Sequence, residues 1–408
     1  MNQTKPEPVT CISQIRCPVC SHEGLEQFFE KSSVPVFCNV LWSSKTEAES
    51  CAKGDIKLAF CPKCSHITNI SFDPSLVNYT ESYDNSLDFS PRFRTYSQSL
   101  AKQLFDRYHL DDADVVEIGC GKGAFLSMLC DLGDNRGTGF DPAVCESELS
   151  STKKTNVRLI KDYYSERYAD YRSDLFICRQ MLEHVFKPTS FVKMLRETIG
   201  NRVNTGVFFE VPNALNIFFN LFIWDIIYEH YSYFTPISLR YIFASNCFQV
   251  CEVGECFENQ FLCLHALPSD RSDLNFGSKQ IGEVNNIQKR LASFGETCKT
   301  VVEAWNRKLQ LAYEKGRRVV LWGSGSKGVS FLNAFKDSHI EYAVDINPEK
   351  QGRFVAGTGQ QIVSPEFLVD YKPDIVIVMN PIYEREIFNY LKKLDLPGQT
   401  ECLSPLSL

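Results

Sequence analysis

Three glycines separated by single residues form the most informative motif of the sequence. Gly119, Gly121 and Gly123 follow Glu117 directly after a short apolar run. Glycines at this spacing allow a tight turn and leave no side chain where the backbone must approach a cofactor. Asp141 ends the next strand-like run, about 20 residues downstream, and its carboxylate is placed to accept hydrogen bonds from a ribose diol. The motif predicts a nucleoside-containing cofactor.

Two cofactor classes use such a loop. A dinucleotide fingerprint has two residues between its last two glycines, whereas this loop has one and also carries an acidic residue before its first glycine. We therefore interpret it as an S-adenosylmethionine site, with a dinucleotide site as the alternative. Asp162 and Tyr163 follow the third predicted strand, where an adenine pocket is expected, and the Tyr163 ring is suited to stack on a base. A surface turn is the alternative interpretation there.

Two histidines follow later strands of the same region. His184 lies in Met181-Leu182-Glu183-His184-Val185, and His230 precedes a predicted helix that begins at Thr235-Pro236. An open α/β sheet binds its ligand at the carboxyl ends of its strands. Glu229 and several aromatic residues surround His230, a setting that suits general base catalysis near neutral pH. A hydrogen-bonded structural histidine is the alternative, above all for His184.

Two Cys-x-x-Cys pairs lie near the start of the sequence. Cys17 with Cys20, and Cys61 with Cys64, supply four thiolates, which is a closed tetrahedral set for structural zinc. The interval between the pairs exceeds the usual 15–20 or so residues, so an insertion must loop out between them. A redox pair is the alternative. We interpret most of the other cysteines, such as Cys178, Cys247 and Cys263, as small buried hydrophobes in a reducing compartment.

A second glycine loop occurs near the end of the sequence. Gly323, Gly325 and Gly328 follow a predicted strand with the GxGxxG spacing, and Asp345 ends the next one. Taken alone, this motif indicates a dinucleotide dehydrogenase.

The elements that position these residues predict an α/β fold. Apolar strand-like runs alternate with helical patterns, which is typical of a doubly wound parallel sheet. Residues 248–257 and 261–268 are close enough to form a hairpin, which predicts an antiparallel strand ending the sheet. A polar stretch, residues 269–286, then precedes one amphipathic helix whose core-facing positions recur every three or four residues. These positions are Ile287, Leu291, Phe294, Cys298, Val301, Trp305 and Leu309.

With 408 residues, the chain exceeds what one hydrophobic core usually organises. We expect a zinc-binding domain over residues 1–78, a methyltransferase domain over 79–268, a linker with a bridging helix over 269–315, and a smaller α/β domain over 316–408. A net charge of -7 without basic runs argues against nucleic acid as a partner. The polar start, residues 1–6, and the interrupted apolar stretch at 214–227 predict a soluble, cytoplasmic protein that does not bind membranes, as a monomer or homodimer.

In these motifs and in their order, the chain resembles the three-domain sugar C-methyltransferases of deoxysugar biosynthesis over almost its whole length. The resemblance implies an N-terminal zinc-binding domain, a class I methyltransferase domain and a C-terminal Rossmann-like domain. The residues that carry it are the paired Cys-x-x-Cys motifs, 117–123, Leu182-Glu183-His184-Val185, Glu210-Val211-Pro212-Asn213, Glu229-His230 through Tyr233-Phe234, 323–328 and Asp345-Ile346-Asn347-Pro348.

The family's substrate is a nucleotide-linked 4-keto-deoxysugar, and the resemblance implies that His230 removes the proton beside the ketone. Glu229, His184 and a tyrosine at Tyr79 or Tyr83 then act as supporting polar groups. The resemblance implies that the C-terminal loop belongs to a domain that closes over the substrate, with Lys327 near the phosphates. A second nucleotide site and a purely structural role are the alternative interpretations of this loop. The sequence departs from the family at Ile227, where a tyrosine is common, and at Glu183.

An enolate mechanism needs an acidified carbon, whereas O-methylation needs only a hydroxyl with a base nearby. O-methylation of a sugar or another small metabolite is therefore the second hypothesis. A zinc-ribbon binding module with a lapsed enzymatic domain, and a dehydrogenase that uses the C-terminal loop, are the hypotheses from other classes.

Overall fold

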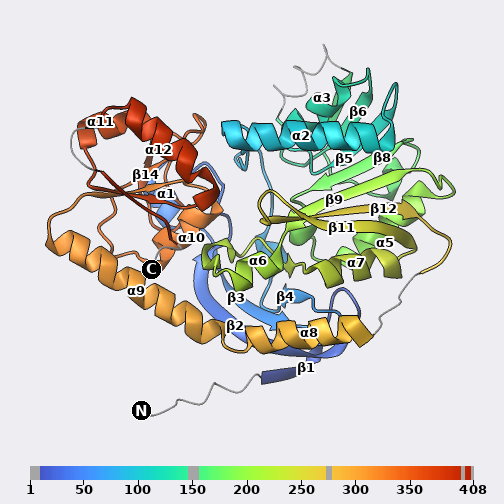
Figure 1. Ribbon diagram of the computed structural model, residues 1–408, viewed down its shortest axis with the longest axis horizontal. Helices are drawn as coiled ribbons and strands as arrows, with labels where there is room; N and C mark the ends of the chain where they lie inside the picture. The colour runs from blue at the N-terminus through green and yellow to red at the C-terminus, as the bar shows by residue number, and fades with distance from the viewer. Residues whose placement is uncertain (1–9, 146–155, 273–277, 397–399, 406–408) are drawn as a thin grey trace.

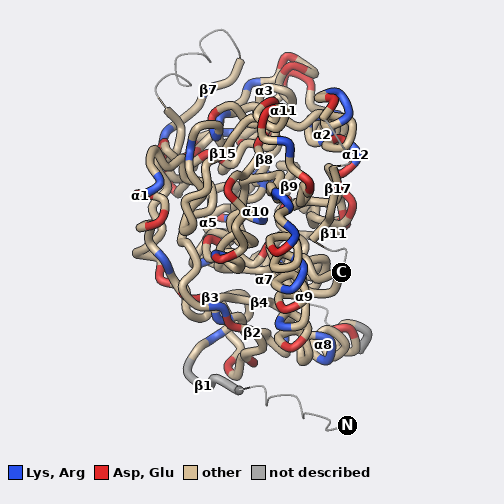
Figure 2. Tube along the Cα trace, turned by 90° about the vertical axis from the view of Figure 1, so that its left-hand side faces the viewer, with Lys and Arg blue, Asp and Glu red and all other residues tan. Residues whose placement is uncertain are grey.

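The computed structural model describes residues 10–145, 156–272, 278–396 and 400–405, and their strands form three β-sheets (Figure 1). Residues 1–6, read above as a polar start, and residues 273–277 of the expected linker lie outside the described residues. No helix in the described ranges is long and apolar enough to cross a membrane. Figure 2 shows that Lys and Arg are interspersed with Asp and Glu along the chain.

The first sheet is antiparallel, with the order β1-β2-β3-β4-β10. Its last strand comes from far along the sequence, because Ser232 pairs with Thr68 and Tyr233 pairs with Ile67. The segment that carries His230 is therefore fixed to the N-terminal sheet by main-chain hydrogen bonds. The strands are β1 (Thr10–Arg16), β2 (Glu23–Pro35), β3 (Lys53–Phe60), β4 (Ile67–Asn69) and β10 (Ser232–Tyr233), and α1 (Lys45–Glu49) lies between β2 and β3.

The second sheet has seven strands in the order β11-β12-β9-β8-β5-β6-β7. β12 runs antiparallel to β9, and β11 runs antiparallel to β12. The predicted hairpin is present, but its antiparallel strand is second from the edge instead of at the end, because β11 folds back outside it. The strands are β5 (Asp114–Ile118), β6 (Arg136–Phe140), β7 (Val157–Ile160), β8 (Leu175–Arg179), β9 (Gly206–Pro212), β11 (Phe248–Cys256) and β12 (Phe261–Pro268).

Helices cover both faces of this sheet. Successive residues of a strand point to opposite faces, and both sets are apolar here, so each face must be buried. Val115 and Ile177 pack on one face with α2 (Pro91–Tyr108) and α3 (Ala124–Cys130). Val116 and Phe176 pack on the other face with α5 (Pro188–Ile199) and α7 (Pro236–Ser245). Both faces are buried, which is the arrangement predicted for a doubly wound sheet. The described residues of this region also form η1 (Pro74–Leu76), η3 (Glu166–Tyr168), η4 (Leu182–His184), α6 (Ala214–Phe219) and η5 (Ile223–Asp225).

The third sheet is parallel throughout, with the order β15-β14-β13-β16-β17. It confirms the expectation of a second, smaller α/β sheet. Its strands are β13 (Val319–Trp322), β14 (Tyr342–Val344), β15 (Gln361–Val363), β16 (Ile375–Val378) and β17 (Glu401–Leu403), and its helices are α10 (Ser326–Ala334), η6 (Pro365–Phe367), α11 (Leu368–Tyr371), η7 (Pro381–Tyr383) and α12 (Glu384–Lys393).

Two helices, α8 (Ser278–Leu291) and α9 (Phe294–Glu314), join the second sheet to the third (Figure 1). The prediction of one helix after a linker to residue 286 was wrong, because α8 begins inside that stretch and the helix breaks at 292–293. The predicted apolar stripe is nevertheless buried along both helices. Trp305 is fully buried, and its indole donates to the Pro405 carbonyl at 3.1 Å. The stripe packs against the N-terminal sheet and the C-terminal domain together.

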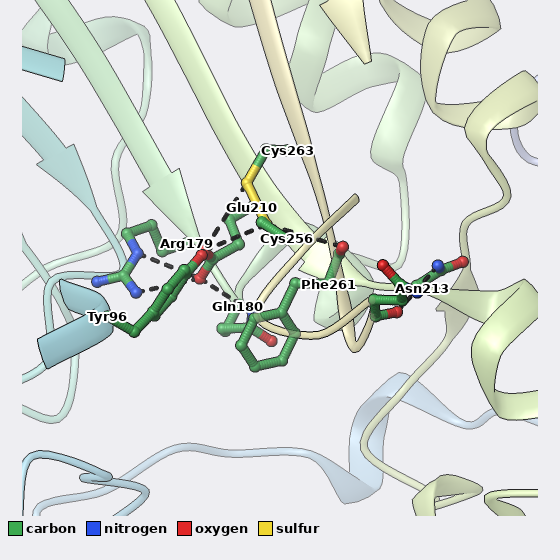
Figure 3. Close-up of a disulfide and its surroundings, with 9 residues drawn as sticks. Tyr96, Arg179, Gln180, Glu210, Asn213, Cys256, Phe261 and Cys263 are labelled. Atoms are coloured by element: carbon green, nitrogen blue, oxygen red, sulfur yellow. Dashed lines mark hydrogen bonds and ion pairs between the residues drawn. A yellow bond between two sulfur atoms is a disulfide. The ribbon is translucent and has the colours of Figure 1, made fainter. Parts of the chain in front are cut away.

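One expectation about the cysteines was wrong. Cys178 is buried as a hydrophobe, but Cys263 forms a disulfide with Cys256 across the β11–β12 hairpin (Figure 3). The carboxylate of Glu210 lies beside this disulfide and is held by Arg179, whose Nε donates to Oε1 at 3.2 Å. Sequence separation alone did not reveal the pair, because the hairpin register is what brings the two sulfurs together.

Candidate active site

The first glycine loop joins β5 to α3 in a left-handed conformation. Gly119 and Gly123 have φ angles of 74° and 76°, which side chains rarely adopt. A Cβ atom on Gly119 would lie 2.9 Å from Met181, and one on Gly123 would lie 2.9 Å from Leu159. A Cβ atom on Gly121 would have no neighbour within 4 Å. Two glycines therefore shape the turn, and the third keeps its outer side open.

Two carboxylates flank this loop. Glu117 is 3% exposed, and its Oε2 has no hydrogen-bond partner among the described residues. Burial raises the pKa of Glu117 to about 8. Asp141 accepts from the Gly121 amide at 3.0 Å and from the Ala143 amide at 2.8 Å, so its carboxylate is fixed at the mouth of the loop. An unpartnered buried carboxylate oxygen beside an open glycine turn fits a cofactor that brings hydroxyl or ammonium donors.

Asp162 and Tyr163 lie after β7, at the same end of the sheet. The Asp162 carboxylate accepts from the Tyr163 amide at 2.8 Å and is also bound by Arg167 and Tyr168. Tyr163 is 58% exposed, and partial burial together with Asp141 raises its pKa. Its ring is thus accessible for stacking, while the Asp162 carboxylate already has protein partners.

The two predicted histidines meet although they come from different parts of the chain. His184 ends η4 after β8, and His230 lies between η5 and β10. Their ring centroids are 5.0 Å apart with an interplanar angle of 73°. The Nδ1 atom of His184 lies 2.9 Å from the hydroxyl of Tyr79 and 3.1 Å from the carbonyl oxygen of Glu229. Burial lowers the pKa of His184 to about 4.

Glu229 is fully buried and joins the same cluster. Its Oε2 accepts from the Tyr83 hydroxyl at 2.8 Å, and its Oε1 accepts from the Cys38 amide at 2.7 Å. Burial raises the pKa of Glu229 to about 7. The carboxylate thus faces Cys38 and Tyr83, while the carbonyl of the same residue contacts His184. The structure brings together Tyr79, Tyr83, His184, Glu229 and His230.

Sequence reasoning missed the N-terminal contribution to this site. Cys38 and Asn39 lie in the insertion between the two Cys-x-x-Cys pairs. Asn39 is 2% exposed, donates to the Ser326 hydroxyl at 3.2 Å and accepts from the Lys350 ammonium at 3.1 Å. No local pattern marks these residues, because the partner of Cys38 lies 191 positions away in the chain and that of Asn39 lies 287 positions away.

The four predicted metal ligands form one compact group. The sulfurs of Cys17 and Cys64 are 3.6 Å apart, those of Cys20 and Cys61 are 3.5 Å apart, and all four lie within 4.8 Å of one another. Zinc–sulfur bonds of about 2.3 Å in a tetrahedron place sulfurs about 3.8 Å apart. The cysteines therefore fit a structural zinc ion and leave no open coordination position.

The second glycine loop makes different contacts. Gly323 has a φ of 106°, and a Cβ on Gly328 would lie 2.0 Å from the Gly323 carbonyl oxygen, so both positions need glycine. Asp345 accepts from the amide and the hydroxyl of Ser324. A Cβ on Gly325 would lie 3.6 Å from the Asn39 amide oxygen and 3.8 Å from the Lys350 nitrogen. The mouth of this loop thus faces the N-terminal insertion.

Both α/β regions match known protein families. Residues 90–253 match the model of a methyltransferase domain, and residues 282–401 match the model of the C-methyltransferase C-terminal domain. The two matches identify the chain as an S-adenosylmethionine-dependent methyltransferase. It is 23% identical to the C-methyltransferase NovU of Streptomyces niveus, and the alignment covers 92% of each protein.

Two solved methyltransferases align with less than half of this chain. A putative S-adenosylmethionine-dependent methyltransferase from Listeria monocytogenes is 13% identical with a TM-score of 0.33, over 43% of this chain and 100% of that chain. Magnesium protoporphyrin IX methyltransferase from Synechocystis PCC 6803, with bound S-adenosylhomocysteine, is 15% identical with a TM-score of 0.35, over 46% of this chain and 91% of that chain.

Proposed function

We propose that the enzyme methylates a carbon atom of a nucleotide-linked keto-deoxysugar. The observation that carries this proposal is the buried cluster of two histidines, two tyrosines and a glutamate described above. Carbon methylation needs a base that removes a proton and polar groups that stabilise an enolate oxygen. A cluster with imidazole and phenol groups at hydrogen-bonding distance offers both kinds of group.

In this proposal His230 is the base, and its neighbours hold the substrate carbonyl and the enolate formed from it. The Tyr79 hydroxyl and His184 form a hydrogen-bonded pair that is suited to polarise that oxygen. Glu229 orients the segment through its carbonyl contact with His184 and anchors Tyr83 through its carboxylate. The carboxylate itself is bonded to Tyr83 and Cys38, so Glu229 acts on the histidines through its backbone.

The methyl donor binds at the first glycine loop in this proposal. Glu117 and Asp141 provide the carboxylates for its amino and hydroxyl groups, while Gly119, Gly121 and Gly123 allow its close approach. Asp162 and Tyr163 lie beside the position of its base. The bound donor supplies an electrophilic methyl group. Zinc at Cys17, Cys20, Cys61 and Cys64 stabilises the N-terminal sheet and has no part in the chemistry.

The C-terminal region acts as a clamp over the substrate. Lys327 at the start of α10 forms an ion pair of 2.6 Å with Asp225 of η5, next to the segment that carries His230. Substrate phosphates would compete with Asp225 for this ammonium group. The proposal divides the chain into a zinc-binding domain over residues 1–78, a methyltransferase domain over 79–268, a bridging region over 269–315 and the clamp over 316–408.

O-methylation of a sugar or another small metabolite is the second candidate. Ile227, which is 5% exposed, stands where the sugar enzymes commonly have a tyrosine, and its side chain offers no polar group to a substrate.

Isothermal titration with S-adenosylhomocysteine, followed by dTDP-, GDP- and CDP-linked keto-sugars, tests the proposal. We expect the product-loaded enzyme to bind one nucleotide class selectively. Turnover with a 13C-methyl donor then shows by NMR whether the new methyl group is bonded to carbon or to oxygen. His230→Asn should abolish turnover and preserve S-adenosylhomocysteine affinity. Binding of S-adenosylhomocysteine without any response to sugars would contradict the proposed substrate.

A further inference from the structure

Glu183 is a buried carboxylate without a role in the reaction described so far. It is 1% exposed and directly precedes His184 in η4. Its Oε1 lies 3.9 Å from His184 Nε2, and its Oε2 has no hydrogen-bond partner among the described residues. Burial of a carboxyl oxygen without a partner is unfavourable, because that oxygen loses its hydration and gains no hydrogen bond in return. Such a group at the centre of an active site calls for an explanation.

The contacts of His184 indicate which of its nitrogens bears the proton. The Glu229 carbonyl oxygen, 3.1 Å from Nδ1, can only accept a hydrogen bond, so Nδ1 carries the hydrogen in the neutral ring. Nε2 is then left with its lone pair toward Glu183. The distance of 3.9 Å between Nε2 and Oε1 is too long for a hydrogen bond, but it lets the charge of an ionised Glu183 act on the ring. An ionised Glu183 would therefore favour a positive charge on the neighbouring imidazoles.

His230 lacks a counter-charge of its own. Its Nδ1 is buried without a partner among the described residues. Burial, His184 and Lys327 lower its pKa well below the ordinary value. The titratable or charged groups that face it are His184, Glu183, Lys327 and Tyr233, with the Glu229 backbone adjacent in sequence. An isolated imidazole in this setting is a weak base at neutral pH.

One nitrogen from each histidine and one oxygen of Glu183 lie within 4.8 Å of one another. Of the carboxyl groups beside the rings, Glu183 has an unpartnered oxygen, whereas both oxygens of Glu229 accept from Tyr83 and Cys38. An ionised Glu183 would therefore stabilise an imidazolium at His230 more directly than Glu229.

We propose that Glu183 is a positioning residue that supplies, through His184, the counter-charge for His230 when His230 takes the substrate proton. This inference rests on the proposed function. The substrate C–H bond breaks, its electron pair remains in the enolate, and the proton moves to His230. The enolate carbon then bonds to the methyl group as the sulfur–methyl bond breaks, and the electrons of that bond return to sulfur. The proton later leaves to solvent.

Glu183, His184 and His230 thus act as one proton acceptor. Burial raises the pKa of Glu183 to about 8, so the carboxyl group ionises, and supplies its counter-charge, as the pH rises through about 8. Position 183 is also one of the two places where the sequence departs from the sugar enzymes.

Titration of histidine resonances tests this inference without any sugar. The full-length enzyme, with 13Cε1-labelled histidine and bound S-adenosylhomocysteine, is followed by NMR from pH 6 to pH 9.5. His184→Gln and His230→Asn assign the two signals. In the wild type, both signals should shift with a midpoint near the pKa of about 8 at Glu183. Glu183→Gln should remove this transition, and Glu183→Asp should retain it.

Glu197→Gln, at an exposed residue of α5, is the matched control and should leave the transition unchanged. The inference is overturned if the wild type shows no shift of either signal in this range, which is decisive even if Glu183→Gln does not fold. An unchanged transition in Glu183→Gln also overturns it.

The result separates the inference from the proposed substrate. If the transition depends on Glu183 but no nucleotide sugar binds, the proton acceptor stands and the substrate assignment fails. With an active substrate, Glu183→Gln should lower kcat at pH 9, where Glu183 is ionised, by about 10-fold or more with little change in KM, because the base loses its counter-charge. The acidic limb of its pH profile should move to lower pH, a change that a purely structural role would not produce.

Discussion

Asn39 connects the N-terminal insertion to the C-terminal domain, and its replacement should measure the strength of that connection. The residue is 2% exposed and joins the Ser326 hydroxyl to the Lys350 ammonium, which is itself 7% exposed. Asn39→Ala removes one neutral hydrogen bond, worth about 1 kcal/mol, and one to a charged group, worth about 1.5–3 kcal/mol. We therefore expect the free energy of unfolding to fall by about 2–4 kcal/mol.

Urea unfolding followed by tryptophan fluorescence suits this measurement, because Trp224, Trp305 and Trp322 are buried near the C-terminal domain. Lys350→Met and the double variant complete a thermodynamic cycle. The coupling between Asn39 and Lys350 should be about 1.5–3 kcal/mol, because the second substitution removes the charge that the first leaves unpaired. Additive effects within about 0.5 kcal/mol would refute the reasoning.

Three further predictions concern the glycine loop, the buried glutamate and the metal ligands. Gly123→Ala should weaken S-adenosylhomocysteine binding in calorimetry, because the new methyl group meets Leu159 at 2.9 Å in a left-handed turn; Gly316→Ala, at an exposed left-handed turn, is the control. Because the pKa of Glu229 is raised to about 7 in the folded protein, the folded state binds a proton that the unfolded state has already lost above pH 5. The free energy of unfolding should therefore fall as the pH rises from about 5 to about 7. Glu229→Gln should flatten that fall in urea titrations, and an unchanged slope would contradict it. Cys61→Ser should release zinc, measured by atomic absorption, and lower the melting temperature; full zinc content would contradict the proposed site.

Much of the fold follows from local patterns in the sequence. Glu117 lies on β5, whose apolar residues are visible as a short run, and Asp141 directly follows β6. Each strand is followed by the turn that the glycines or the carboxylate require. The buried stripe from Ile287 to Leu309 was also predictable, because helical spacing repeats through it. These features depend on neighbours a few residues away, and such neighbours are visible in a single sequence.

The parts that sequence reasoning missed depend on contacts between distant segments. Cys38 binds Glu229 with its backbone amide, a group that every residue except proline carries, so no residue type marks the contact. The break between α8 and α9 interrupts a stripe whose spacing continues across it. Cys256 pairs with Cys263 only because the hairpin register places them together.

β10 has a consequence for anyone who would build chimeric enzymes from this scaffold. The strand places two residues of the catalytic region in the N-terminal sheet, and the Ser65 hydroxyl, next to a metal ligand, lies 2.6 Å from the Thr235 hydroxyl at the start of α7. Exchange of residues 1–78 for the same region of a relative would therefore replace the strand that pairs beside His230. Recombination of such enzymes should treat β4 and β10 as one inherited unit, even though they lie far apart in the gene.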